Sequence, residues 1–303
     1  MGEPGNDSAV LSDSTRPTVR RAHGWLRHLL SHKGVSLGGG LLLAIFALAL
    51  LAPLIAPFDP YDQNLSRRLI PPVWFEKGSW EHPFGTDGFG RDYLTRILYG
   101  ARTSLFVGIT GTALAMIIGT FMGVVAGYFG GRVDMIVTFL ITTRLSLPLF
   151  LTALAIVAIV GNSIEILILA IGLLIWDRFA VVMRAATQQT RQLDYVAAAR
   201  AVGCSTPRIL FGEILPNVAS ALIVVATLEV AHAILLSAAL SFLGLGVQPP
   251  TPDWGLMIAE GKPFMFFDGW LIALPGAALF ILILSMNLLG DGIRDITAPD
   301  QRH

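Results

Sequence analysis

The sequence is short of charged residues. Only 14% of its 303 residues are Asp, Glu, Lys or Arg, whereas 54% are apolar. Soluble globular domains usually carry roughly a quarter charged residues, so this composition excludes an ordinary soluble protein. It also excludes a chain that is disordered over most of its length, because disordered chains are poor in apolar residues. The class that remains is a polytopic membrane protein.

Cysteine is almost absent, and the charges balance. Cys204 is the single cysteine, which excludes an intrachain disulfide and a multi-cysteine metal site. The 21 basic and 21 acidic residues cancel, so we expect no nucleic-acid partner, since nucleic-acid binders present a strongly cationic surface. The sequence also lacks the zinc motif H-E-x-x-H and the phosphate-binding motif G-x-x-x-x-G-K-S/T. We therefore expect no catalytic, cofactor or metal residues in this chain.

Long apolar stretches with few or no charges mark the predicted spans. A hydrocarbon core about 30 Å thick needs roughly 20 apolar residues in a helix. The sequence offers six such stretches, at Leu41–Ala56, Thr103–Phe129, Met135–Val160, Ile164–Met183, Asn217–Leu243 and Trp270–Leu289. Together they predict an all-α polytopic membrane protein with six transmembrane helices and no soluble catalytic domain.

Lys and Arg in the short flanks orient these spans, because cytoplasmic flanks are enriched in both. They predict a cytoplasmic N-terminal tail (1–33), a first transmembrane helix (34–58), an extracytoplasmic loop (59–102), a core of five helices (103–290) and a cytoplasmic C-terminal tail (291–303). The loop 59–102 fits the rule poorly, since it holds six basic residues beside six acidic ones. We retain it outside because moving it would misplace every later loop.

Three glycines, Gly119, Gly123 and Gly127, recur every four residues in the second predicted span. This spacing places them on one face of a helix, where the missing side chains let another backbone approach closely. We expect this face to be a helix–helix contact.

The segment 184–216, between the fourth and fifth spans, is the one elaborate stretch that we predict to be cytoplasmic. Asp194 is predicted to cap a first short helix, and Gly203 to end it in the left-handed conformation. One face of this helix is apolar and rich in small residues, through Tyr195, Ala198, Ala199 and Val202.

A second short helix follows directly. Ser205 or Thr206 is predicted to cap it, with Pro207 in its first turn, and Pro216 is predicted to end it before the fifth span. A helix–glycine–helix of this size fits a groove on another protein. The alternative is a passive loop that lies on the membrane.

At this point the sequence resembles a known family. The run Y-V-A-A-A-R-A-V-G at 195–203, followed by I-L-P-N at 214–217, resembles the EAA loop of ABC importer permeases. Four further runs resemble the C-type permease subunit of the dipeptide, oligopeptide and nickel branch. They are F-G-T-D-G-F-G-R-D at 84–92, L-Y-G-A-R-T-S-L at 98–105, S-F-L-G-L-G-V-Q-P-P-T-P-D-W-G at 241–255 and N-L-L-G-D-G-I-R-D at 287–295. The resemblance covers about residues 25–297.

The resemblance implies the fold of a type I ABC importer transmembrane domain (MetI-like) in the inner membrane of a bacterium. It implies a homologous B-type permease that shares the translocation path, two ABC ATPase subunits that bind and hydrolyse ATP, and an extracytoplasmic substrate-binding protein. The chain would then be a transporter subunit and not itself an enzyme. The implied substrate is a dipeptide or oligopeptide, with nickel chelates, haem or another small solute as alternatives. A different class, an ion-coupled secondary transporter, would show inverted repeats, and we find no repeat.

The resemblance also assigns the segment 184–216 the role of a coupling helix that docks on the ATPase. The residues implied to act there are Tyr195, Ala197, Ala198, Ala199, Gly203, Leu215 and Pro216. Ala197 departs from the family pattern, which has Glu at this position. In the predicted helix Ala197 is the third residue after the Asp194 cap, where a Glu would complete a capping-box-like arrangement.

Charged residues inside the spans are costly, so each needs an explanation. Glu229 and His232 lie three residues apart in the fifth span. They are either a polar patch on the translocation path, where Glu229 meets the amino terminus of a peptide, or a helix–helix pair. We expect Arg144 to extend to the inner membrane surface, and Asp177 and Arg178 to lie at the interface near the inner end of the fourth span.

Overall fold

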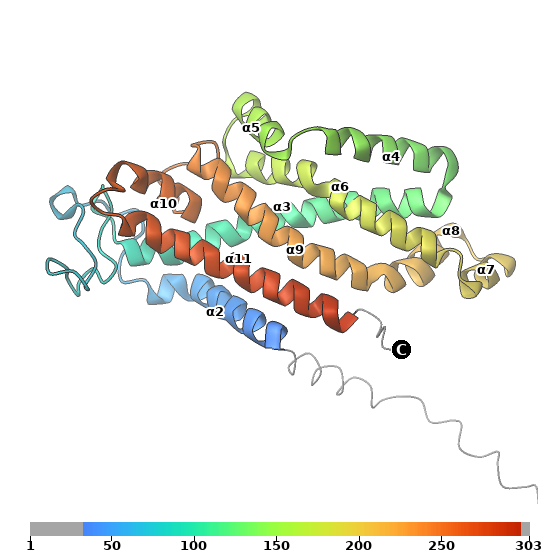
Figure 1. Ribbon diagram of the computed structural model, residues 1–303, viewed down its shortest axis with the longest axis horizontal. Coiled ribbons are helices and arrows are strands. Elements are labelled where there is room, and N and C mark those ends of the chain that lie inside the picture. The colour runs from blue at the N-terminus through green and yellow to red at the C-terminus, as the bar shows by residue number, and fades with distance from the viewer. Residues whose placement is uncertain (1–32, 298–303) are drawn as a thin grey trace, which may run out of the picture.

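The structure is a computed structural model that describes residues 33–297. The predicted cytoplasmic tail before Lys33 and the last residues of the C-terminal tail lie outside the described residues. Within them the chain is helical, with two isolated bridges and no β-strand. Figure 1 shows the long helices side by side along one axis. We call the end with the loop 56–92 and α10 the loop end, and the opposite end, with α7 and α8, the α7 end.

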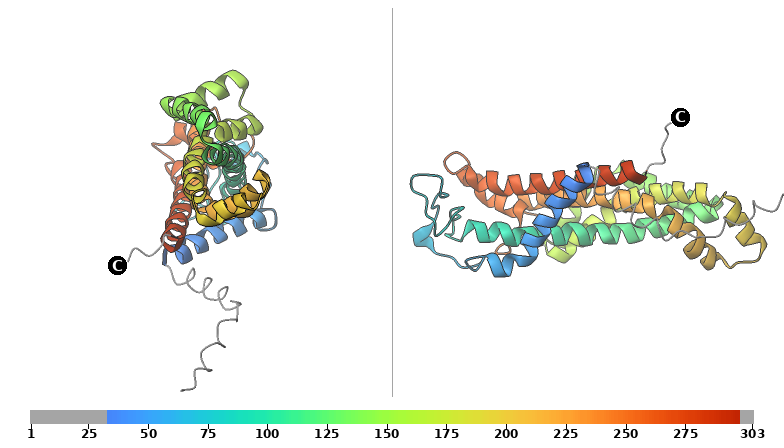
Figure 2. Two further views of the ribbon diagram at one scale, coloured as in Figure 1. Left: turned by 90° about the vertical axis from the view of Figure 1, so that its right-hand side faces the viewer. Right: turned by 90° about the horizontal axis from the view of Figure 1, so that it is seen from below.

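The helices carry the labels of Figure 1. They are α2 (Lys33–Ile55), α3 (Tyr93–Phe129), α4 (Gly131–Ser146), α5 (Leu149–Val160), α6 (Ile164–Thr190), α7 (Asp194–Ala201), α8 (Thr206–Ile209), α9 (Leu215–Phe242), α10 (Trp254–Gly261) and α11 (Trp270–Thr297). A π-helical turn η2 (Leu210–Ile214) joins α8 to α9, and 3₁₀ turns η1 (Leu65–Arg67) and η3 (Lys262–Phe264) lie at the loop end. α2 crosses obliquely over α3 and α11 (Figure 2).

Five of the helical segments in residues 33–297 are long and apolar enough to cross a membrane: α2, α3, α6, α9 together with α8, and α11. The bent pair α4 and α5 makes a sixth if the two are counted as one span. The prediction of an all-α polytopic protein is therefore confirmed, with six spans on that count.

The third predicted span is not a single helix. α4 and α5 meet at an angle of 88°, and the bend is visible at the top of Figure 1. Leu147 has an extended backbone with ψ 127°, and Pro148 follows as the N-cap of α5. A residue before proline avoids the α conformation, and proline has no N–H to continue the helical ladder. An apolar stretch alone does not reveal such a break.

Two helices are longer than the charge-free stretches predicted. α3 begins at Tyr93 rather than near Thr103, because the Asp92 carboxylate accepts a hydrogen bond from the Thr95 N–H at 2.8 Å and caps the helix. α6 continues past Met183 to Thr190. The 37 residues of α3 span roughly 55 Å, against a hydrocarbon core of about 30 Å. Charge-free stretches therefore mark the apolar part of a helix and not its ends.

The glycine face of α3 is a close contact with α6, as predicted. A Cβ on Gly119 would overlap the carbonyl oxygen of Trp176, and one on Gly127 would lie 2.7 Å from the carbonyl oxygen of Arg184. Gly123, between them, meets the α6 backbone in the same way. The two helices run in the same direction, and their backbones touch along several turns.

Candidate functional site

α7, the first short helix between α6 and α9, begins one residue earlier than predicted. The N–H groups of Val196 and Ala197 both donate to the carbonyl oxygen of Leu193, at 3.0 and 3.2 Å, so Leu193 is the N-cap of α7. Asp194 is the first helical residue, where its charge still favours the helix start. The predicted Asp194 cap is therefore wrong. A Glu in place of Ala197 would not complete a capping box with it.

Gly203 ends α7 as predicted. Its φ is +80°, and its N–H donates to the Arg200 carbonyl oxygen at 3.0 Å. The Cys204 N–H donates to the Ala199 carbonyl oxygen, also at 3.0 Å. This pair of bonds is the Schellman motif, which satisfies the last carbonyls of a helix through a left-handed residue. A Cβ on Gly203 would meet open space, so the glycine is required by the backbone conformation and not by packing.

α7 has one buried side chain, Val196, which packs among residues of α6, α8 and α9. Ala199 packs partly against this cluster, although the sequence placed it on the outward apolar face. Tyr195, Ala198 and Val202 of that face are exposed, Val202 to 78%. α7 lies at the end of the bundle (Figure 1). It contacts the other helices through few side chains and leaves apolar surface exposed.

Pro216 does not end the second helix. The run Thr206–Phe242 is one apolar helical segment, because the π turn at Leu210–Ile214 absorbs the proline. The Leu215 N–H donates to the Leu210 carbonyl oxygen, five residues back, and Pro216 follows in the first turn of α9, where a missing N–H is tolerated. Leu215 and Pro216 therefore lie in the first turn of α9.

A charged group lies in the middle of the bundle, between α6 and α9. Nη1 of Arg178 lies 3.1 Å from Oε1 of Glu229, and Nδ1 of His232 lies 3.6 Å from the same oxygen. Glu229 and His232 were singled out from the sequence, but Arg178 was not recognised as their partner. Arg178 lies about 21 Å from the start of α6 and about 18 Å from its end, at 1.5 Å per residue.

Asp177 and Arg178 were predicted to lie at the interface near the inner end of the fourth span, and α6 continues beyond that span to Thr190. Both lie near the middle of α6, and the Asp177 side chain is buried. The Arg144 guanidinium donates to the carbonyl oxygen of Leu174 in α6, a partner that the sequence did not predict. α4 ends at this depth, so a helix carbonyl on α6 is the acceptor within reach.

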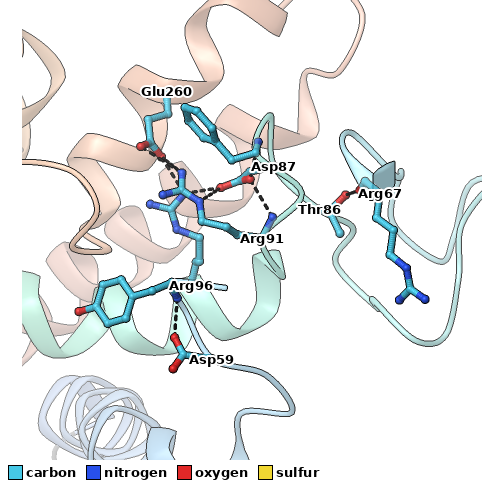
Figure 3. Close-up of polar contacts among 9 residues, drawn as sticks. Asp59, Arg67, Thr86, Asp87, Arg91, Arg96 and Glu260 are labelled. Carbon is cyan, nitrogen blue, oxygen red and sulfur yellow. Dashed lines mark hydrogen bonds and ion pairs between the residues drawn. The ribbon is translucent and has the colours of Figure 1, made fainter. Parts of the chain in front are cut away.

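A second charged group lies at the loop end (Figure 3). Arg91 Nε lies 2.6 Å from Asp87 Oδ2, and Arg91 Nη2 lies 3.1 Å from Glu260 Oε2. Arg96 Nη1 contacts the same two carboxylates, that of Glu260 at 2.7 Å. The two arginine side chains are 2% and 0% exposed. Two positive and two negative charges thus neutralise each other, which accounts for two of the six basic residues in the loop 59–102.

Asp253 ties α10 to α3 beside this group. Its carboxylate accepts the Leu256 N–H at 3.1 Å as the N-cap of α10, and it accepts the Ser104 hydroxyl of α3 at 2.7 Å. Burial raises the pKa of the Asp253 carboxyl above its usual value. Neither Glu260 nor the Asp253–Ser104 contact was found from the sequence, because sequence spacing does not show which distant segments meet.

Family models match most of the chain. Residues 119–303 match the binding-protein-dependent transport system inner membrane component, and residues 22–72 match the N-terminal TM domain of oligopeptide transport permease C.

Curated relatives match almost end to end. The dipeptide transport system permease protein DppC of Haemophilus influenzae is 39% identical over 88% of this chain and 91% of its own. The di/tripeptide transport system permease protein DppC of Pseudomonas aeruginosa is 41% identical over 89% of each. The glutathione transport system permease protein GsiD of Pectobacterium atrosepticum is 37% identical over 96% of this chain and 94% of its own.

Solved structures share the fold. A chain of the inward-facing MetNI methionine ABC transporter superposes with a TM-score of 0.56 at 16% identity, over 67% of this chain and 97% of that chain. A second crystal form gives 0.55. The predicted MetI-like fold is confirmed. From its family matches, its full-length relatives and this fold, the chain belongs to the binding-protein-dependent inner-membrane permeases of ABC importers, as a C-type member of the peptide branch.

Proposed function

We propose that this chain imports dipeptides and oligopeptides as one permease subunit of an ATP-driven importer. A homologous B-type permease completes the translocation path, two ABC ATPase subunits supply the energy, and an extracytoplasmic substrate-binding protein delivers the peptide. The chain lies in the inner membrane of a bacterium with both termini in the cytoplasm, the α7 end inside and the loop end outside. The full-length relatives, which are dipeptide and di/tripeptide transport system permeases, support the substrate class.

The observation that carries the coupling role is the exposed apolar face of α7 above the Gly203 turn. Tyr195, Ala198 and Val202 offer apolar surface at the end of the bundle, where a groove on an ATPase subunit can cover it. The helical run from Thr206 to Phe242 leads from this turn to Glu229. A displacement of α7 therefore moves the middle of the bundle, because a helix transmits displacement along its axis.

The coupling proposal is tested by a charge on the exposed face. In complex purified in mild detergent, Val202→Asp is expected to lose the ATPase subunits and at least tenfold of ATP-driven uptake, because docking would bury a carboxylate without a partner. Val202→Leu, which keeps the apolar character, is the matched control and should retain both. The proposal fails if the Val202→Asp complex keeps its ATPases and its uptake.

The energy source and substrate are tested with the same complex in liposomes. Uptake of a labelled dipeptide is expected to need ATP inside the compartment that holds the α7 end, and an imposed ion gradient without ATP should give none. Competition by unlabelled oligopeptide, but not by nickel chelate or haem, is the expected pattern. Uptake driven by the gradient alone would assign the chain to secondary transport instead.

A further inference from the structure

The charged group in the middle of the bundle exposes basic side chains, whereas the sequence suggested that the acidic Glu229 faces the substrate. The side chain of Glu229 is 7% exposed, whereas those of Arg178 and His232 are 42% and 52% exposed. Oε1 of Glu229 faces Arg178 and His232, and Oε2 is buried with no hydrogen-bond partner among the described residues. A passing ammonium group therefore cannot reach the carboxylate, and the bundle surface here consists of guanidinium and imidazole.

We propose that Arg178 and His232 form a binding site for the carboxylate of a substrate in transit, in a peptide its C-terminal carboxylate. This inference rests on the proposed function. Glu229 pairs with Arg178 and neutralises its charge, and it does not itself meet the substrate. The site gives the translocation path a preference for substrates with a free carboxyl group.

The donors fit a carboxylate. A guanidinium has five N–H donors in a planar fork. Within the described residues, Arg178 donates to Glu229 through one nitrogen, Nη1. The remaining donors match the two oxygens of a carboxylate in bidentate geometry. His232 directs Nδ1 toward Glu229 and keeps its second ring nitrogen for another partner.

Lipid is not the occupant of this face. The group lies inside two candidate membrane-spanning segments, α6 and Thr206–Phe242. An exposed cation facing the hydrocarbon would cost about 2.5 kcal/mol or more. The face must therefore be covered by protein or by a water-filled path.

Charge balance favours the path over a fixed partner residue. Glu229 already neutralises Arg178, so an acidic side chain from a second subunit would leave one net negative charge buried permanently. A carboxylate that binds and leaves bears that cost only transiently. The neutralisation by Glu229 also keeps the hold of Arg178 weak, which a translocation path needs if the substrate is to depart.

The experiment compares a labelled dipeptide with its C-terminal amide in liposomes that hold the complete importer. The measured quantity is the acid-to-amide ratio of initial uptake rates. Every variant shares one substrate-binding protein, so a change in this ratio reports the permease alone. The double variant Arg178→Gln/Glu229→Gln removes both charges together and leaves no lone buried charge. It is expected to lower the ratio roughly tenfold, the worth of a charge-assisted hydrogen bond.

Three further variants separate the alternatives. His232→Gln should lower the ratio about threefold, which keeps the test open if the double variant does not assemble. Glu229→Gln alone should keep or raise the ratio, because it frees Arg178. Leu235→Gln, on an exposed position of α9 one turn further, is the matched control and should not change it.

The proposal is overturned if the ratio stays unchanged in both the double variant and His232→Gln while peptide is still imported. It is also overturned if Glu229→Gln selectively slows peptides with a free amino terminus relative to N-acetylated ones, since Glu229 would then bind the substrate itself. Loss of B-type permease from the double variant, with an unchanged ratio in His232→Gln, would assign the pair to the subunit interface. A wild-type complex that imports no peptide would contradict the proposed function instead.

Discussion

At the loop end, Arg91 and Arg96 are buried between two carboxylates that come from separate segments of the chain, whereas at the α7 end a whole helix is anchored by the side chain of Val196. In this cluster the loop end neutralises its own buried charges. The α7 end leaves apolar surface and a backbone turn that nothing in the described residues covers. The difference indicates that one end is a fixed platform and the other is completed by a partner.

The largest effect is expected from breaking the platform. Arg96→Gln leaves Asp87 and Glu260 with one guanidinium between them, so a buried negative charge remains uncompensated. We expect a loss of roughly 3–5 kcal/mol in the free energy of unfolding, measured by thermal or denaturant unfolding of the assembled complex. Arg67→Gln is the control, because Arg67 pairs with Glu81 in an exposed position and should change stability little. Equal losses of unfolding free energy in Arg96→Gln and Arg67→Gln would show that the buried arginine stabilises the protein no more than the exposed one.

Two glycines with the same backbone conformation sharpen the comparison. Gly90 at the loop end has φ +75°, and a Cβ there would overlap the carbonyl oxygen of Asn64, whereas Gly203 has φ +80° and open space around it. Gly203→Ala should destabilise the protein only because alanine disfavours the left-handed conformation, by about 1–2 kcal/mol. This loss should be confined to residues 194–209. Gly90→Ala should cost more, because strain and overlap add.

Hydrogen exchange and uptake distinguish the two glycine variants. Gly203→Ala should speed amide exchange in residues 194–209 and lower uptake per ATP hydrolysed, with little change in the unfolding of the whole complex. Gly90→Ala should lower the unfolding temperature itself. If Gly203→Ala destabilises the whole complex as much as Gly90→Ala does, the α7 end is packed as tightly as the loop end.

The smallest effect is a pH dependence at the loop end. Because burial raises the pKa of Asp253 in the folded protein, its stabilising contribution is complete below the unfolded pKa of about 3.9 and is lost as the pH rises through the folded pKa. Asp253→Asn keeps an oxygen acceptor for the Leu256 N–H and remains a good N-cap, and its amide N–H can donate to the Ser104 hydroxyl oxygen. The variant should therefore unfold at the wild-type temperature in acid and at a higher temperature near neutral pH. A constant difference across the pH range would contradict the buried-carboxylate explanation.

The sequence predicted local features well and long-range pairings poorly. Gly203 was found because a left-handed helix end has a local signature, and the Gly119–Gly127 stripe because its spacing defines one helix face. The ion pair between Arg178 and Glu229 joins two helices whose rotation about their axes depends on the whole bundle, so no local pattern reveals it.

The other differences between prediction and structure have local causes. The Leu193 cap was missed because a main-chain carbonyl starts the ladder without a side-chain signal. Pro216 was taken to end a helix because a π turn has no marked sequence pattern, and the bend before Pro148 was hidden by apolar residues on both sides.

The glycine stripe of α3 also fixes an order of events during synthesis. Its partner surface on α6 is made only after α4 and α5 have left the ribosome, so the central helix pair must wait for two intervening helices. A bulky side chain at Gly119, Gly123 or Gly127 would therefore act on biogenesis before it could act on transport. With the α3 and α6 backbones held apart, the expected defect is a smaller amount of folded protein and not a slower transporter.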